Sequence, residues 1–201
     1  MLEFNEKNLE RRLSALSARK QAAFLLLLCE RMMPEFRQFA SEVGLDLTVC
    51  RDCLECGWEY LAGNPSTHDY LALAEACLRI APDTEDHDHV LTSAALDAAL
   101  SLNDLMIFLS DQKIDHIVEA ASLARDTVFL YLRCTQGPGL DSLSLEDENR
   151  HPLMQRELKR QEEDLVFLEC LPSDVDEKLI PSLRERSKRR PEMLAPVEPC
   201  Q

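Results

Sequence analysis

The sequence has few of the residues that build strands and tight turns. Only 13 of its 201 residues are valine or isoleucine and 5 are glycine, against 35 leucines. Because β-branched side chains favour strands, whereas leucine loses little rotamer freedom in a helix, this balance predicts an all-α protein. The sequence shows no internal repeat and no segment with a convincing strand pattern.

Long apolar segments are also missing. The longest uninterrupted apolar run is Ala22–Cys29, and its 8 residues fall well short of the roughly 20 that span a bilayer. Acidic Glu3, Glu6 and Glu10 stand where a secretory signal would carry basic residues. We therefore expect a cytoplasmic protein without a membrane segment, in which the 8 cysteines stay reduced as thiols.

Positive charge is scarce as well. Lysine and arginine number 22 against 37 aspartates and glutamates, which gives a formal net charge of −15. Because a nucleic-acid partner needs a basic surface to neutralise its phosphates, this balance argues against one. The only basic cluster, residues 184–190, has no interleaved aromatic side chains, and we expect it to solubilise a tail or to meet the protein's own acidic surface.

Common catalytic motifs are absent from the sequence. It contains no glycine-rich phosphate loop, no H-E-x-x-H pair and no G-x-S-x-G elbow. A di-iron bundle needs two Glu-x-x-His pairs, and only Glu148-x-x-His151 matches, with Pro152 directly after it. These absences argue against an enzyme without excluding one, and no cofactor is predicted.

Helical periodicity predicts a single domain of eight or nine helices over residues 1–188. The helices at 90–109 and 114–134 are expected to form a core hairpin. Residues 140–151 are polar and acidic and are predicted to be a mobile loop, and residues 189–201 a disordered tail. The expected helices cover about residues 9–16, 18–33, 34–44, 47–62, 68–80, 90–109, 114–134, 152–171 and 173–181.

Capping and breaking residues set the expected helix ends. Ser17 and Thr67 are predicted N-caps, and Gly44 is a predicted C-terminal stop. Pro34 is expected to begin a separate helix, and Pro181 to kink or end the last one. Each of these signals depends only on residues close to it in the sequence.

A group of three cysteines is the sharpest chemical signal. Cys50, Cys53 and Cys56 have the C-x-x-C-x-x-C spacing that can hold an iron–sulfur cluster, with Cys77 as a distant fourth ligand. In a continuous helical pattern, however, they spread over an arc of about 120°. A free cysteine is more often a small buried hydrophobe than a ligand, so packing is the favoured interpretation and a metal or redox site the alternative.

Four charged residues are candidates for a small polar cleft. Glu30 and Arg31 lie at the end of the most apolar helix, and together with Glu59 and Asp97 they could bind a small ligand. The favoured interpretation is structural, because such polar groups mostly serve packing register. The segment Asp83–His89 has the residue types of a metal site but is more typical of an acidic turn in solvent.

Several segments resemble one bacterial family. Phe24–Pro34, with the letters FLLLLCERMMP, is followed in order by Trp58-Glu59 and by Ala95–Ala98. These segments and their helical spacing are similar to the YjaG-like proteins, a domain of unknown function with the family number 416. The resemblance runs from about residue 5 to residue 188. It implies an all-helical, soluble, cytoplasmic bacterial protein and supplies no catalytic residues.

Three functions follow as hypotheses. The preferred one is a non-enzymatic protein that acts through protein–protein contact, as an interaction or regulatory module. It rests on the charged helix at 152–171, which is expected to be exposed. The partner is unknown, and homo-oligomer contacts such as a homodimer are included. The alternatives are a metal or redox protein using Cys50, Cys53 and Cys56, and a ligand binder or enzyme with the polar cleft.

Overall fold

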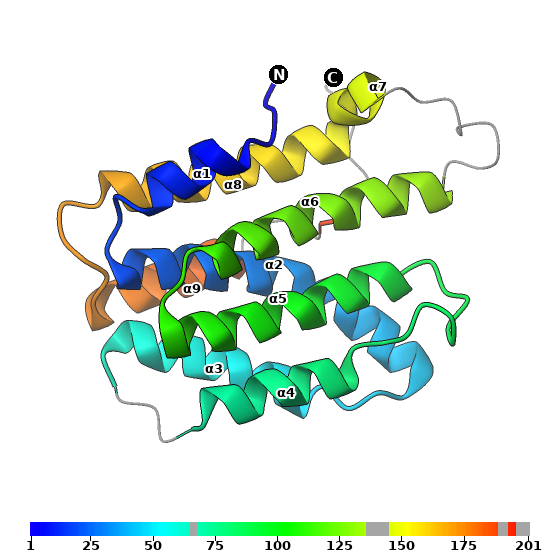
Figure 1. The fold of residues 1–201 in the computed structure, drawn as a ribbon, viewed down its shortest axis with the longest axis horizontal. Helices are drawn as coiled ribbons and strands as arrows, with labels where there is room; N and C mark the ends of the chain where they lie inside the picture. Colours follow the sequence, from blue (N-terminus) through cyan, green and yellow to red (C-terminus); the bar gives the residue numbers. More distant parts are fainter. Residues whose placement is uncertain (65–67, 136–144, 189–192, 196–201) are drawn as a thin grey trace.

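The computed structural model describes residues 1–64, 68–135, 145–188 and 193–195 (Figure 1). Within these ranges the chain is all-helical and has no strand, which confirms the predicted fold class. The helices are α1 (Glu6–Leu13), α2 (Ala18–Val43), α3 (Thr48–Ala62), α4 (Tyr70–Ile80), α5 (Thr92–Asp111), α6 (Asp115–Thr135), α7 (Leu145–Arg150), α8 (Pro152–Cys170), the 3-10 turn η1 (Glu177–Leu179) and α9 (Ile180–Lys188).

Two predicted capping residues, Ser17 and Gly44, lie at the ends of α2. The Ser17 hydroxyl accepts the Lys20 backbone N–H at 3.3 Å and begins α2. Gly44 ends α2 in the left-handed conformation, with φ of 75°. At α4 the cap is Asp69, whose carboxylate accepts two N–H groups of the first turn. The predicted cap Thr67 lies outside the described residues.

Both prolines expected to interrupt helices lie inside them, so these two predictions are wrong. Pro34 sits within α2, which runs on to Val43. A proline costs a helix interior about 3 kcal/mol. Here Met33 and Phe36 on either side are fully buried, and their packing offsets that cost. Pro181 lies in the first turn of α9, where its fixed φ suits a helix start and no intrahelical hydrogen bond is lost.

Helix α5 lies at the centre of the bundle, packed against α2, α4 and α6 (Figure 1). The predicted hairpin of α5 and α6 is therefore present, with α2 and α4 as further neighbours of α5. Among the described helices α5 is the one long and apolar enough to cross a membrane, but 72% of its most apolar window is buried inside the bundle. Its position as the core helix accounts for its composition.

Close helix approach at one glycine brings α3 onto the core. A Cβ atom on Gly57 would lie 2.9 Å from Leu26 Cδ1 of α2 and 3.5 Å from Leu105 Cδ2 of α5. The absence of a side chain at this position lets leucines of two helices fill the space. The buried apolar side chains of α1 to α6, α8 and α9 then form one cluster.

The C-terminal part differs from the sequence prediction in two places. Helix α7 occupies Leu145–Arg150, within the expected mobile loop 140–151; residues 140–144 lie outside the described part. In the expected tail 189–201, Met193 and Leu194 are 1% and 7% exposed and belong to the core cluster. The remaining residues of that tail, 189–192 and 196–201, are not described.

Candidate functional site

A group of buried charges lies where α8 packs on α2. The Arg31 guanidinium donates from Nη1 to Asp164 Oδ2 at 2.7 Å and from Nη2 to Glu157 Oε1 at 3.1 Å. Asp164 Oδ1 accepts a further hydrogen bond from Arg186 Nε of α9 at 2.7 Å. The side chains of Arg31, Glu157 and Asp164 are 5%, 1% and 2% exposed. Three helices are therefore joined by ion pairs inside the protein.

This network overturns the expectation that the charged helix 152–171 is exposed. Glu157, Arg160, Gln161 and Asp164 form a buried face of α8, at the i, i+3, i+4, i+7 spacing of a helix stripe. Gln161 Nε2 donates to Glu157 Oε1 and to the Ala121 carbonyl, both at 3.1 Å. The stripe expected to meet a partner meets the core instead.

Burial and pairing act against each other in this network. Burial lowers the pKa of the Arg31 guanidinium, but Glu157 and Asp164 raise it, and it ends above its ordinary value. Removing these ions from water costs several kcal/mol each, and their attraction roughly offsets that cost. We therefore assign the network to fixing the position of α8 on α2, because a mispositioned α8 would leave charges buried without partners.

A turn near the C-terminus is held beside this network through its backbone. Glu35 Oε1 of α2 accepts the Leu194 N–H at 2.8 Å. Arg156 Nη2 of α8 donates to the carbonyls of Met193 and Ala195, both at 2.6 Å. Hydrogen bonds to charged groups are stronger than neutral ones, and these three bind main-chain atoms rather than particular side chains. We call this place the docking site.

A hollow of about 220 Å³ adjoins the docked turn. Its walls come from α2, from the segment before α5 and from α6, and the turn supplies the remaining side. The lining residues are Glu35, Gln38, Val90, Leu91, Tyr131, Leu194 and Ala195. The docked turn therefore leaves apolar wall, including the 48% exposed Val90, uncovered.

The four residues predicted for a polar cleft have partners on different elements. Glu30 accepts the Trp58 Nε1–H of α3 at 3.0 Å, whereas Arg31 faces α8. Asp97 accepts the Thr127 hydroxyl of α6 at 2.7 Å, and burial raises the pKa of its carboxyl to about 6. Glu59 is exposed on α3. The structure does not bring these four side chains into one cleft, and we build no function on it.

The three cysteines of α3 are all buried. Cys53 Sγ lies 3.4 Å from Cys77 Sγ of α4, and the neighbouring thiol and burial raise the pKa of Cys53. Burial also raises the pKa of Cys50, to about 12. Cys56 lies near Glu59 and His68 instead. The three thiols therefore have different surroundings, and Cys50 and Cys53 are buried in the apolar core cluster.

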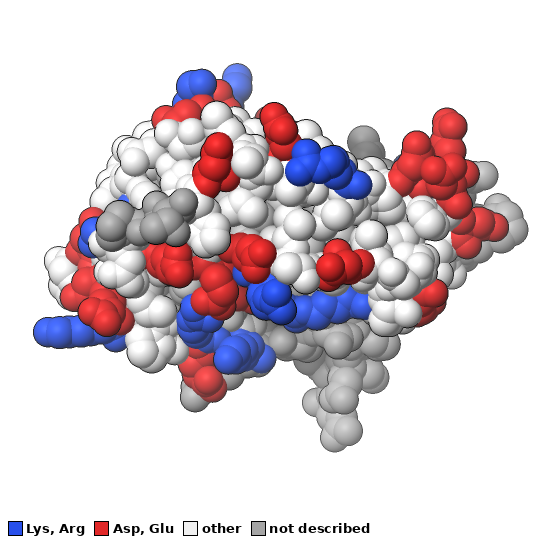
Figure 2. All heavy atoms as spheres, turned by 90° about the horizontal axis from the view of Figure 1, so that it is seen from below, with Lys and Arg blue, Asp and Glu red and all other residues white. Residues whose placement is uncertain are grey.

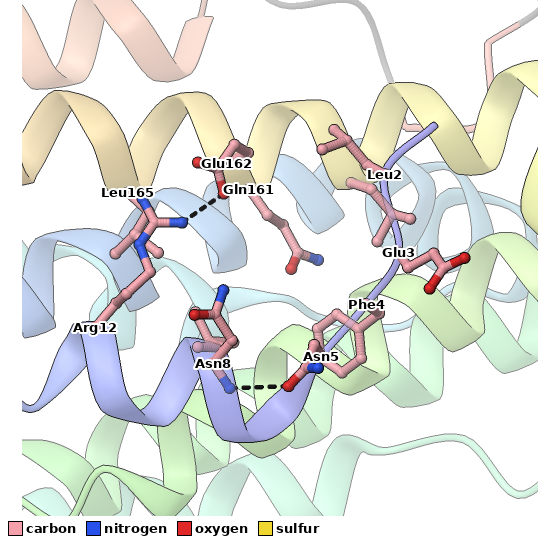
Figure 3. A pocket seen from close by; sticks show the side chains of 11 residues that line it. Leu2, Glu3, Phe4, Asn5, Asn8, Arg12, Gln161, Glu162 and Leu165 are labelled. Carbon is pink, nitrogen blue, oxygen red and sulfur yellow. Dashed lines mark hydrogen bonds and ion pairs between the residues drawn. The ribbon is translucent and has the colours of Figure 1, made fainter.

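A small pocket lies between the N-terminal segment and α8 (Figure 3). Phe4, Asn8 and Arg12 line one side, with Gln161 and Glu162 of α8 on the other. Its volume is about 70 Å³, whereas pockets for small molecules hold roughly 300–1,000 Å³. The pocket has room for a few water molecules, each of which takes about 30 Å³ in the liquid. It is too small for a cofactor.

Arg184 and Arg186 contact the protein's own acids, which is one of the two expectations for the cluster 184–190; residues 189 and 190 lie outside the described part of the chain. Arg184 makes two hydrogen bonds to Glu55, at 2.9 and 2.6 Å, and its guanidinium lies 4.7 Å from the Trp58 ring centre. Arg186 binds Asp164. On the face in Figure 2, most basic side chains likewise lie beside acidic ones, while a separate acidic group occupies the right-hand end.

Sequence reasoning missed Glu35 and Arg156, which bind the docked turn. No motif marks them. The sequence offers two separate hints. Met193 and Leu194 are apolar residues in a proline-rich tail, and Glu35 and Arg156 are charged residues in helical segments that also carry an apolar stripe. These hints do not indicate that the tail contacts Glu35 and Arg156, because each contact joins residues more than 30 positions apart in the sequence.

Comparison with known proteins agrees with the resemblance to the YjaG-like family. The family described as "Protein of unknown function (DUF416)" matches residues 8–191. The "Uncharacterized protein YjaG" of Escherichia coli K12 is 29% identical over 176 residues, which cover 86% of this chain and 87% of the relative. An uncharacterized protein of Haemophilus influenzae is 26% identical over 132 residues, covering 64% and 67%.

A solved structure shows the same fold. The crystal structure of a DUF416 family protein from Shewanella baltica OS155 matches with a TM-score of 0.77 at 22% identity, and the match covers 89% of this chain and 92% of that one. At this identity the likeness supports the fold alone. Because the family match spans most of its length, the chain belongs to the DUF416 family of proteins of unknown function.

Proposed function

We propose that this protein is an interaction module that binds a short apolar segment of a partner protein at the docking site. The observation that carries the proposal is the backbone clamp of Glu35 and Arg156 around Met193–Ala195. In this view the protein's own turn occupies the site as an internal ligand, and a partner segment displaces it. We place this activity in the cytoplasm, where free thiols stay reduced.

The clamp suits a peptide ligand because its hydrogen bonds to the main chain do not depend on the side chains of the bound segment. The hydrogen bonds of Glu35 and Arg156 to the docked turn involve its main-chain N–H and C=O groups, which every residue except proline offers in full. Met193 and Leu194 add buried apolar surface, worth about 1.5–3 kcal/mol for each fully buried side chain. A neutral apolar segment is therefore the ligand class, since an acidic one would face Glu35.

The unfilled hollow indicates how a partner could outcompete the internal turn. A segment tethered in the same chain acts at an effective concentration on the order of millimolar, so a partner must bind more tightly to displace it. Ala195 and Leu194 border the hollow. A larger apolar side chain at the position of Ala195 would cover Val90 and Leu91. Burying a phenylalanine contributes about 1.5–3 kcal/mol, a gain of at least about tenfold in affinity.

Peptide binding to the full-length chain tests the proposal. The probe is a fluorescein-labelled peptide of residues 190–198, RPEMLAPVE, and a second peptide carries Ala195→Phe. The protein variant Leu194→Asp should release the internal turn, because the new carboxylate meets Glu35 in a buried place. We expect fluorescence anisotropy to show stronger peptide binding to L194D than to the wild type, and about tenfold stronger binding of the phenylalanine peptide.

Matched variants separate the clamp from general effects. In the L194D background, Arg156→Ala should abolish most peptide binding, whereas Lys159→Ala on the same helix, with a 70% exposed side chain, should leave it unchanged. Circular dichroism checks that each variant is folded, and Glu35→Gln provides a second, milder change in the clamp. Equal peptide binding by wild type and L194D, or binding that survives both clamp variants, would overturn the proposal.

A second copy of the chain would bring the same apolar segment. Native mass spectrometry at increasing protein concentration tests that occupant directly. A dimer that forms in the wild type and is lost in L194D would identify the segment of a second copy as the ligand. A strictly monomeric wild type would leave the partner segment to another protein.

A further inference from the structure

Three potential metal ligands converge at the C-terminal end of α3. Cys56 and Glu59 lie three residues apart on the helix, which places them on neighbouring parts of one face. His68 lies beyond the end of α3, where Gly63 is the C-cap in the left-handed conformation, with φ of 79°. The Cys56 sulfur, a Glu59 carboxylate oxygen and a His68 ring nitrogen all lie within 4.8 Å of one another.

From this geometry we infer that Cys56, Glu59 and His68 form a binding site for a divalent transition-metal cation, with zinc as the best match. Thiolate sulfur, imidazole nitrogen and carboxylate oxygen are the ligand types of zinc. Iron–sulfur clusters need several thiolates, and magnesium and calcium prefer oxygen ligands alone. The donor set therefore distinguishes this site from the C-x-x-C-x-x-C hypothesis, since it uses one of those cysteines.

The required adjustment of the ligands is small. Around a tetrahedral zinc with bonds of about 2.0–2.3 Å, the ligand atoms lie roughly 3.4–3.7 Å apart. The three side chains must therefore close by at most about 1 Å. Cys56 is buried and fixed, with 1% of its surface exposed, whereas Glu59 and His68 are exposed and can rotate toward it. Asp69 holds the start of α4 directly after His68 and limits how far that residue can move.

The cation would occupy a position with three protein ligands and one open place. Sites of this kind leave the fourth position to water or to a substrate atom. When the metal–sulfur bond forms, the Cys56 thiol loses its proton to solvent, and His68 binds as the neutral imidazole.

Titration of the full-length protein with Zn²⁺ and Co²⁺ tests the site. We expect one equivalent of either cation to bind, measured for Zn²⁺ by competition with a chromogenic chelator. Bound Co²⁺ should give a sulfur-to-cobalt charge-transfer band and the visible bands of tetrahedral cobalt. Glu59→Gln and His68→Gln, both at exposed positions, should each weaken Zn²⁺ binding by about tenfold or more, and Cys56→Ser should remove the charge-transfer band.

Variants of the same residue types elsewhere serve as controls. Cys134→Ser, Glu75→Gln and His89→Gln change exposed or partly exposed groups away from the site and should leave the affinity unchanged. Cobalt binding without the charge-transfer band would overturn the inference, because it excludes Cys56 as a ligand. So would binding that depends on His89 and not on His68, which would place the cation at the acidic segment 83–89.

Discussion

The substitution Arg31→Met tests whether the ion pairs between α2 and α8 hold the fold together. Methionine retains most of the apolar stem but leaves Glu157 and Asp164 buried without the guanidinium. Removing one partner of a buried ion pair costs about 3–5 kcal/mol. In a chain of 201 residues each kcal/mol lowers the melting temperature by about 2–4 °C. We therefore expect R31M to melt about 10 °C below the wild type.

Arg12→Met is the matched control because the ion pairs of Arg12 are as short as those of Arg31 but more exposed to water. Arg12 contacts Glu162 and Glu169 at 2.6 and 2.7 Å, as short as the pairs of Arg31. Those two carboxylates are 43% and 33% exposed, so water screens the pairs, and their loss should cost about 1 kcal/mol or less.

Urea unfolding followed by circular dichroism measures both changes. Repeating it in about 1 M salt, where the Debye length is about 3 Å, should shrink the R12M effect and leave the R31M effect largely intact. If R31M destabilises the protein no more than R12M does, or if salt abolishes its effect, the buried network does not hold α8 on α2.

Two further predictions concern a carboxyl group and the cysteines. Burial raises the pKa of Asp97 in the folded state to about 6, above its ordinary value of 3.8. Between these two pKa values the folded state keeps a proton that the unfolded state has lost. The free energy of unfolding therefore falls as the pH rises toward and through the folded-state pKa of about 6. Asp97→Asn should therefore reduce the loss of unfolding free energy between pH 5 and pH 8 by about 1 kcal/mol in urea titrations, and an unchanged pH dependence would contradict the assignment. The thiol reagent DTNB tests the burial of the cysteines in a Cys200→Ser variant, which removes the cysteine outside the described residues. The exposed Cys134 and Cys170 should react rapidly, and the 5 buried thiols only after unfolding. Rapid reaction of more than two thiols would show that the buried cysteines are accessible.

Local signals in the sequence predict the helices well because their physics is local. Ser17 and Gly44 act through hydrogen bonds and backbone conformation within a few residues of themselves. Pro34 shows the limit of this reasoning, since its local cost is known but the packing of Met33 and Phe36 that offsets it comes from other helices. Helix existence was therefore predictable, and the continuity of α2 was not.

The sites depend on pairings that no local pattern contains. The charged stripe of α8 was visible in the sequence, but charged residues usually face water, and its true partners Arg31 and Arg186 lie on two other helices. Cys56 was noticed for its spacing to Cys50 and Cys53, yet its neighbours are Glu59 on the next helical turn and His68 beyond the end of α3. In each case the residue was identified and its contacts were not.

The exchange rate of the Leu194 amide hydrogen tests the proposed docking function most directly. In the wild-type protein this N–H donates to Glu35, so nuclear magnetic resonance should show it protected from solvent exchange. Adding an excess of the Ala195→Phe peptide should displace the internal turn and make the exchange fast, while amides of α5 stay protected. Protection of Leu194 that persists under saturating peptide would contradict displacement at the docking site, and rapid exchange without any peptide would contradict docking itself.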